Sequence, residues 1–365
     1  MTIPPRRLPL LLGLLVLAST ACPGLRAADA DRQVVGAGDA RFRYGGRIDF
    51  RDPASPDLVW QASTVALDFT GDRLAVRLAG VQGQVFLNAT VDGATVVLDP
   101  PDGGPTQEIP VAVSGPGPHH LVLFKRTEAS AGTAHFAGVA IAAGARASRP
   151  SAVPARLRME IYGDSITAGA CDEDGPQDQW ADRRTHNAAR SWAADTAAAV
   201  GADYRNIAVS GIGVADGYAD VLMGQVWDRI APAADAPKAD LTAWTPDVVL
   251  VLLGQNDDGH PRVHGQPFPA AFVANYIALV RALRSAYPHA HVVLLNGGMW
   301  AGVNSPDLGP AWGRAVAQLE AGDPAISHFT FRHWTNNHPR VADHPAMADE
   351  LVAWLGPQPF MAPPR

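Results

Sequence analysis

Residues 157–169 carry the sequence Leu-Arg-Met-Glu-Ile-Tyr-Gly-Asp-Ser-Ile-Thr-Ala-Gly, an apolar run that ends in a polar turn. The apolar run predicts a buried strand over Leu157–Tyr162. If that strand belongs to a parallel sheet, the turn after it lies at the carboxyl edge, where ligands bind in α/β proteins. Ser165 is therefore a candidate nucleophile, although Gly-Asp-Ser alone is also common as a turn or helix cap.

The rest of the second half alternates apolar runs with helical patterns. This alternation is typical of a parallel sheet that is covered by helices on both faces. The expected strands are Leu157–Tyr162, Tyr204–Val209, Asp247–Leu253, His291–Asn296 and Ser327–Arg332, and the expected helices are Ala188–Val200, Phe268–Ala286, Ala311–Leu319 and Pro345–Leu355. We therefore expect an α/β catalytic domain over residues 157–365.

The first half shows a different pattern, in which turns separate short runs of β-branched residues or of alternating apolar and polar residues. This pattern predicts an antiparallel β-sandwich over residues 31–143. Within it, Val85–Val91 and Ala94–Leu98 flank Asp92-Gly93, which is a strong hairpin signal because a tight turn needs positive φ angles. Residues 144–156 are mostly Ala, Gly, Ser, Arg and Pro without periodicity, and we predict that they form a linker.

The first thirty residues have the layout of a secretory signal, with two arginines, the apolar run Leu8–Leu17 and then small residues. We therefore expect export to the periplasm or the extracellular space. Cleavage before Cys22 would create a lipoprotein, whereas cleavage after Ala27 or Ala30 would not. The apolar run is shorter than the roughly 20 residues that span a bilayer, so no transmembrane segment is expected.

Charge and cysteine usage restrict the partners that we expect. The formal net charge of −7 gives no electrostatic reason to bind nucleic acid. Cys22 and Cys171 are the two cysteines of the chain, and their spacing resembles no metal site. We expect neither a metal nor another cofactor, no cysteine nucleophile, and a monomer.

Two further turns follow predicted strands, Ser210-Gly211-Ile212-Gly213 and Gly254-Gln255-Asn256-Asp257. Acyl transfer needs hydrogen-bond donors where the carbonyl oxygen becomes negative. The amides of Ser165 and Gly211 and the side chain of Asn256 are candidates for this oxyanion hole. The alternative interpretation is that Gly211 only permits a turn and that Asn256 only caps the following segment.

A serine nucleophile also requires a base, and the candidates lie late in the chain. His338 follows the last predicted strand and is our choice. His344 stands beside Asp343 in a pattern that suggests a helix N-terminus, and His333 falls at the strand end, so they rank second and third.

Taken together, these blocks resemble the SGNH/GDSL hydrolase superfamily. Residues 163–166, Gly211, Asn256 and His338 match, in order, the blocks that supply the nucleophile, two oxyanion donors and the catalytic histidine. The resemblance implies a flavodoxin-like SGNH hydrolase domain and a serine esterase with Ser165 and His338 as catalytic residues.

The first half resembles the jelly-roll-like sandwich domain of carbohydrate esterase family 2, at residues 44–49, 91–93 and 125–128. Members of that family are two-domain enzymes that remove acetyl groups from plant polysaccharides such as xylan and glucomannan. The resemblance thus implies an acetylated polysaccharide or oligosaccharide as the substrate and hydrolysis through an acyl-enzyme.

One position departs from the superfamily pattern. An Asp usually stands three residues before the catalytic His, but Thr335 occupies this place and Asn336 comes next. Because neither side chain is a carboxylate, we expect a Ser-His dyad in which a carbonyl orients His338, as the family resemblance allows.

Tryptophans in the second half suggest where a sugar ring could stack. Trp300 and Trp334 directly follow predicted strands and are our candidates for substrate binding, Trp180 is undecided between stacking and core packing, and Trp192 sits in a helical pattern typical of a core residue. Two alternatives remain open: a lipid or short-chain acyl esterase or thioesterase, and a catalytically inactive glycan-binding protein.

Overall fold

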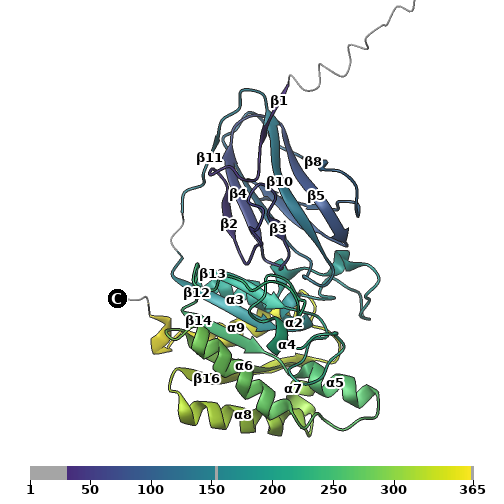
Figure 1. Ribbon diagram of the computed structural model, residues 1–365, viewed down its shortest axis with the longest axis vertical. Coiled ribbons are helices and arrows are strands. Elements are labelled where there is room, and N and C mark those ends of the chain that lie inside the picture. Colours follow the sequence, from purple (N-terminus) through teal and green to yellow (C-terminus); the bar gives the residue numbers. More distant parts are fainter. Residues whose placement is uncertain (1–30, 153–154, 363–365) are drawn as a thin grey trace, which may run out of the picture.

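The computed structural model describes residues 31–152 and 155–362. The predicted signal sequence and Cys22 lie outside these residues. In the described part of the chain, no helix combines the length and the apolar character needed to cross a membrane. Two domains are stacked along the long axis, with the β-rich domain above the α/β domain in Figure 1.

The first domain is a sandwich of two antiparallel sheets, because its strands bury alternate residues and each sheet therefore has one apolar face. The first sheet has the order β1-β10-β5-β8 with β3 beside β10, and the second has the order β11-β4-β9-β6-β7 with β2 beside β4. The strands are β1 (Arg32–Val35), β2 (Arg43–Gly45), β3 (Asp57–Leu58), β4 (Thr64–Phe69), β5 (Leu74–Gly83), β6 (Leu87–Val91), β7 (Ala94–Leu98), β8 (Gln107–Val111), β9 (His119–Lys125), β10 (Gly132–Ala142) and β11 (Ala147–Ser148).

The predicted hairpin is present as β6 and β7, and Asp92 and Gly93 both have positive φ angles, of 52° and 88°. The predicted linker differs from the structure. Ala147–Ser148 pairs with Asp68–Phe69 and so adds the strand β11 to the edge of the second sheet. The pairing satisfies backbone groups that would otherwise be left at that edge, and the small, aperiodic residues gave no sign of it.

The second domain contains a parallel sheet with the order β13-β12-β14-β15-β16, which is the flavodoxin-like strand order, so the predicted fold class is confirmed. Its strands are β12 (Leu157–Gly163), β13 (Ala202–Ala208), β14 (Val248–Leu252), β15 (His291–Met299) and β16 (Ile326–Thr335). Every residue of β14 is buried, as expected for the centre of a sheet that is covered on both faces.

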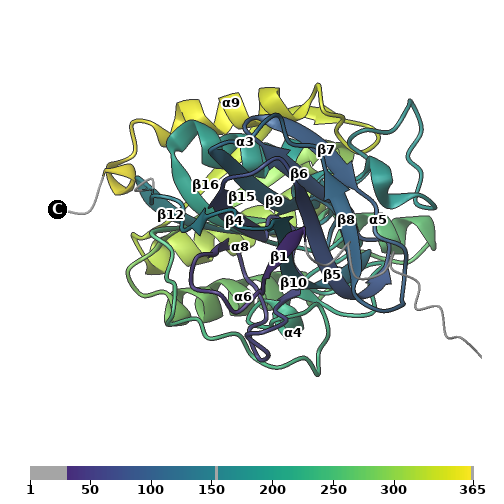
Figure 2. The ribbon, with the colours of Figure 1, turned by 90° about the horizontal axis from the view of Figure 1, so that it is seen from above.

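Helices cover the two faces of this sheet, with α3 and α9 on one side and α4, α6 and α8 on the other (Figure 2). The helices are α2 (Ser165–Ala168), α3 (Trp192–Val200), α4 (Met223–Val226), α5 (Gln255–Val263), α6 (Phe272–Ala286), α7 (Trp300–Asn304), α8 (Leu308–Gly322) and α9 (His344–Leu355). Helix α3 starts later than the predicted Ala188, because the Ser191 hydroxyl caps it by accepting from the Ala194 amide. Trp192 is fully buried, as predicted.

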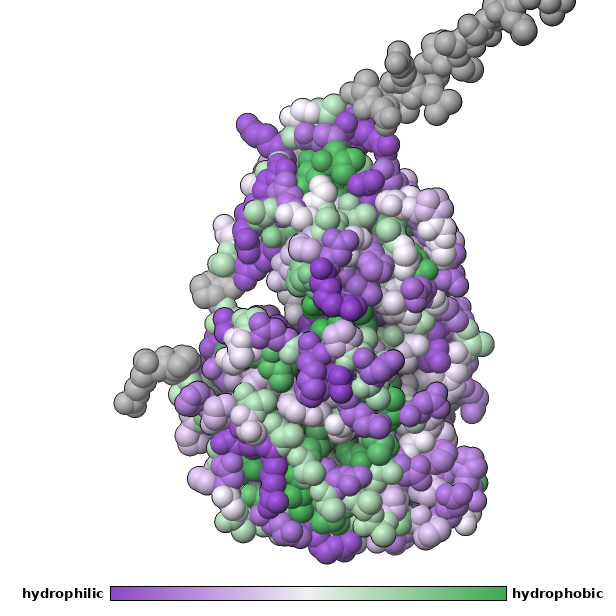
Figure 3. Space-filling view, in the orientation of Figure 1, coloured by the Kyte–Doolittle hydropathy of each residue, from purple (hydrophilic) through white to green (hydrophobic). Residues whose placement is uncertain are grey.

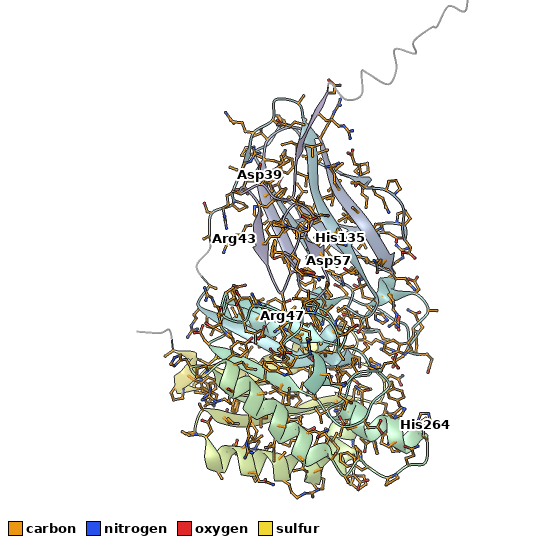
Figure 4. All side chains as sticks on the ribbon, in the orientation of Figure 1. Asp39, Arg43, Arg47, Asp57, His135 and His264 are labelled. Carbon is orange, nitrogen blue, oxygen red and sulfur yellow. The ribbon has the colours of Figure 1, made fainter. Side chains whose placement is uncertain are left out.

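The two domains are joined by buried polar contacts. Arg47 of the sandwich donates from Nη2 to Glu160 Oε1 of β12 at 2.9 Å and to the Tyr162 hydroxyl at 3.1 Å. Arg47 lies at the junction of the two domains in Figure 4. On the face shown in Figure 3, hydrophilic residues are spread over both domains and over the boundary between them. Val59 and Trp60 of the sandwich also belong to a hydrophobic cluster of the second domain, so the domain contact combines apolar burial with specific ion pairing.

Candidate active site

Ser165 lies at the carboxyl end of β12, as the sequence predicted for it. The strand ends at Gly163, and Asp164 caps the short helix α2 by accepting from the Ile166 amide at 3.1 Å. A Cβ atom at position 163 would lie 2.1 Å from Thr167 Oγ1, so only glycine fits there. The Asp164 cap and the close packing of Thr167 against Gly163 together hold the Ser165 side chain at the edge of the sheet.

His338 is the candidate histidine that reaches Ser165, because its Nε2 lies 2.8 Å from Ser165 Oγ. The competing histidines have other partners: His333 Nε2 lies 3.0 Å from Asp343 Oδ1, and buried His344 Nδ1 accepts from the Trp192 amide. The geometry therefore favours His338 over both alternatives as a base.

The structure corrects the expected dyad, because a carboxylate does orient His338. Asp178 Oδ2 lies 2.6 Å from His338 Nδ1 and also accepts from the His338 backbone amide at 3.2 Å. An ionised carboxylate can only accept, so Nδ1 carries the proton and Nε2 is left to accept from Ser165. Thr335 instead donates its hydroxyl to the Asn337 carbonyl and shapes the turn.

Asp178 is held as an anion. Burial by itself would raise the pKa of its carboxyl, but the hydrogen bond from His338 and the nearby Arg340 guanidinium, 2.8 Å away, bring that pKa well below its usual range. Sequence reasoning missed Asp178 because it lies 160 residues before His338, in an acid-rich loop without periodicity. Nothing local distinguishes it from its neighbours Asp174 and Asp182.

The loop after β13 brings the predicted donor Gly211 beside Ser165. Gly211 has a φ of 79°, a left-handed conformation that favours glycine. A Cβ atom there would also lie only 3.0 Å from Tyr218 Cβ, so a larger residue would be crowded. Among the described residues, no acceptor is bonded to the amides of Ser165 or Gly211. Both amides are thus free to donate to a substrate oxygen at the cleft.

Asn256 lies in the first turn of α5 and is nearly buried. Its Nδ2 donates to the Ile212 carbonyl at 2.8 Å, which holds the amide against the Gly211 loop. Because an amide nitrogen carries two hydrogens, a second N–H remains to face Asp164, 3.5 Å away, or a substrate oxygen.

Two buried carboxyl groups lie beneath these donors. Asp257 accepts from the amides of Val214, Ala215 and Asp216 and so ties the Gly211 loop to α5. Burial raises the pKa of Asp164 to about 7 and that of Asp257 to about 6, although backbone hydrogen bonds oppose both shifts. Two carboxyl groups that hold the loops of this site therefore change their protonation near neutral pH.

Ser165 and His338 open into a cleft of about 480 Å³. Two tryptophans stand in its walls, each with a guanidinium over its ring: Arg183 over Trp180 at 4.9 Å and Arg262 over Trp300 at 4.8 Å. The lining consists of Ser130, Ser165, Trp180, Arg183, Ser210, Gly211, Tyr218, Gln255, Asn256, Gly259, Arg262, Met299, Trp300, Ala301, Asn336 and His338. Trp334 is exposed and lies outside this lining, so it forms no wall of this cleft, whereas Trp180 does.

One group of potential metal ligands overlaps this site. Ligand atoms of Cys171, Asp178 and His338 lie within 4.8 Å of one another. Burial raises the pKa of the Cys171 thiol, so the sulfur stays protonated, and Asp178 and His338 are bonded to each other. The arrangement suits a hydrogen-bonded catalytic group better than a cation.

Family comparisons divide the chain in the same way as the structure does. Residues 44–150 match the family described as Carbohydrate esterase 2 N-terminal, and residues 161–349 match the GDSL-like Lipase/Acylhydrolase family. The second match covers the three strand ends and the loop that carry the site.

Individual relatives agree with this division. The cellulase/esterase CelE of Acetivibrio thermocellus is 32% identical over 323 residues, which are 85% of this chain and 38% of CelE. The chain thus spans well under half of that longer relative. An acetylxylan esterase / glucomannan deacetylase of Cellvibrio japonicus is 27% identical over 371 residues, which are 95% of this chain and 96% of that protein.

A solved structure extends the likeness to three dimensions. The family two carbohydrate esterase from Clostridium thermocellum in complex with cellohexaose superposes with a TM-score of 0.76 at 29% identity, covering 86% of this chain and 98% of that one. The chain therefore belongs to the GDSL-like lipase/acylhydrolase family, in the two-domain form of the family 2 carbohydrate esterases, and is a carboxylic ester hydrolase.

Proposed function

We propose that this protein is an exported serine esterase that removes O-acetyl groups from polysaccharides of the xylan or glucomannan type. The observation that carries the proposal is the hydrogen-bonded chain from Ser165 through His338 to Asp178, with distances of 2.8 Å and 2.6 Å, at the mouth of a cleft. The names of the relatives, an acetylxylan esterase / glucomannan deacetylase among them, support the choice of substrate.

In the proposed reaction, Ser165 Oγ attacks the acetyl carbonyl carbon while His338 Nε2 takes its proton. Asp178 stabilises the imidazolium that forms and keeps the ring oriented. The tetrahedral oxyanion accepts hydrogen bonds from the amides of Ser165 and Gly211 and from Asn256 Nδ2.

The intermediate then collapses and the sugar hydroxyl leaves with the proton from His338. A water molecule, deprotonated by the same Nε2, attacks the acetyl-serine; the bond from Ser165 Oγ to the carbonyl carbon then breaks, His338 returns the proton to Oγ, and acetate is released. The scheme uses the side chains present in the site and assigns no step to a cofactor. Trp180 and Trp300 offer aromatic walls against which sugar rings can pack.

Export is proposed from the signal-like pattern of residues 1–30, with release into the periplasm or outside the cell as a monomer, or anchoring through Cys22. Expression in a secreting host tests this, since mass spectrometry of the mature N-terminus distinguishes cleavage after Ala27 or Ala30 from lipidation at Cys22.

The central experiment compares the wild-type protein with Ser165→Ala on a chromogenic acetate. We expect hydrolysis by the wild type and none above background by the variant, while equal rates would refute the serine mechanism. Acetyl and octanoyl esters are then compared: a preference for octanoyl would indicate a lipid esterase. Acetate release from acetylated xylan, glucomannan and a set of other acetylated glycans then tests the substrate class.

A further inference from the structure

The β-sandwich contacts the oxyanion loop, residues 209–213, through a buried carboxylate. Glu128 lies just after β9, is fully buried and accepts from the Ser210 amide at 2.7 Å with Oε2. Ser210 immediately precedes Gly211, so this hydrogen bond restrains the peptide that leads into the proposed donor. Burial would raise the pKa of Glu128, but the hydrogen bond from the Ser210 amide and the nearby His186 ring, with Nδ1 3.8 Å from Oε1, lower it to about 2, which keeps the acceptor ionised.

A second set of sandwich contacts holds the Asp178 segment, residues 171–190. Gln84 follows β5, and its side chain makes two hydrogen bonds to the backbone of this segment. Its Nε2 donates to the Ala181 carbonyl and its Oε1 accepts from the Arg183 amide, both at 2.9 Å. Arg126 donates to the Arg184 carbonyl at 2.8 Å and pairs with Glu173. The segment that carries Asp178 is thus attached to the other domain on both sides of Ala181.

The two sets of contacts meet in the wall of the cleft. Glu128 Oε1 lies 3.4 Å from Arg183 Nη1, and Arg183 covers Trp180. Trp180 in turn meets the His338 ring edge to face, with 5.2 Å between ring centroids. Ser130, also from the sandwich, lines the cleft itself.

We infer that the sandwich domain is a positioning part of the catalytic centre: Glu128 holds the oxyanion loop, and Gln84 and Arg126 hold the segment that presents Asp178. The inference rests on the proposed esterase function and gives the first domain a role within it, in place of an independent glycan-binding module. Its physical basis is that catalytic groups act only when held close to their productive geometry, since a displacement of about 1 Å can lower a rate on the order of 100-fold.

Gln84→Ala is the main test, because Gln84 is exposed and its loss leaves the cores intact. We expect kcat on a chromogenic acetate to fall about tenfold or more, with KM within about twofold, since Asp178 acts on the chemical step. Gln107→Ala is the matched control: the Gln107 side chain also makes two hydrogen bonds to backbone groups, but its partners, the carbonyls of Pro101 and Gly103, both lie within the sandwich. It should keep the wild-type kcat.

Glu128 is tested with a graded pair. Glu128→Ala should lower kcat more than Glu128→Gln does, because an amide oxygen can still accept from Ser210. Thermal unfolding of each variant separates a loss of fold from a loss of positioning. Wild-type kcat in folded Gln84→Ala and Glu128→Ala proteins would overturn the inference.

A readout independent of activity completes the experiment. Amide hydrogen exchange, followed by mass spectrometry, should be faster over the Asp178 segment in Gln84→Ala and over the oxyanion loop in Glu128→Ala, but unchanged in Gln107→Ala. If the wild type hydrolysed no acetate, the proposed function would fail while this exchange pattern still tested the positioning. Unchanged exchange in every variant would refute the inference alone.

Discussion

Asp178 supplies at the residue scale what Thr335 and Asn336 do not. A carboxylate beside a histidine Nδ1 selects the tautomer and stabilises the imidazolium. The chain provides it from the loop between α2 and α3, which crosses over to His338 in space. The carboxylate lies far from the usual place along the sequence, yet its Oδ2 is 2.6 Å from His338 Nδ1.

Asp178→Asn is expected to lower kcat on the order of 10⁴-fold, because an amide can turn its N–H toward Nδ1 and select the wrong tautomer. Steady-state kinetics on a chromogenic acetate measure this. Asp182→Asn is the control, since Asp182 lies in the same segment but its carboxylate caps a turn through the Arg184 amide and otherwise contacts, among the described residues, only the exposed Arg184 side chain. If the kcat of Asp178→Asn were close to that of Asp182→Asn, Asp178 would not contribute to catalysis, and Ser165 and His338 would act as a dyad.

Asp164 predicts a pH dependence of stability. Its pKa is raised from 3.8 to about 7 on folding, so the folded state binds more protons than the unfolded state between these values. The free energy of unfolding should therefore fall as the pH rises through this window. Asp164→Asn removes this contribution, so its chemical denaturation should depend less on pH between about 4 and 7. Parallel curves for both proteins would contradict the prediction.

At the scale of the elements, three turns at the carboxyl ends of β12, β13 and β14 bring the proposed nucleophile and the proposed donors together. Parallel strands end at one edge of the sheet, so residues far apart in sequence meet there. Asp257 then ties the second turn to the third through three amide hydrogen bonds. The donors are held in place before substrate arrives, which is what electrostatic stabilisation of an oxyanion requires.

Asn256→Ala tests the third turn. Loss of one oxyanion donor typically raises the barrier by about 3–4 kcal/mol, so kcat should fall by roughly 10²–10³ with little change in KM. The measurement is steady-state hydrolysis of an acetyl ester, together with thermal unfolding to confirm that the variant is folded despite the loss of the hydrogen bond to the Ile212 carbonyl. A rise in KM at constant kcat would instead assign Asn256 to substrate binding.

At the scale of the whole molecule, the buried pair of Arg47 and Glu160 ties the sandwich to β12. Removing Arg47 leaves the buried Glu160 charge with only the more distant Arg205 guanidinium, 3.9 Å away, as an ion-pair partner among the described residues. Arg47→Met is expected to lower the free energy of unfolding by about 3–5 kcal/mol in denaturant titrations. The double variant Arg47→Met/Glu160→Gln should regain part of it, and no difference between the single and double variants would argue against a coupled pair.

The sequence by itself determined the alternation of strands and helices and the sandwich-plus-α/β fold class, because periodicity is a local property of the chain, and its short motifs carried the resemblance to the esterase family. It also pointed to Ser165, Gly211, Asn256 and His338, since each lies just beyond a predicted strand. Only the tertiary structure decided that Asp178 faces His338, that Trp180 and not Trp334 joins Trp300 in the cleft, and that the sandwich reaches the catalytic loops. The physical reason is that these contacts form between aperiodic loops, whose paths are set by packing between domains and leave no signature in nearby residues.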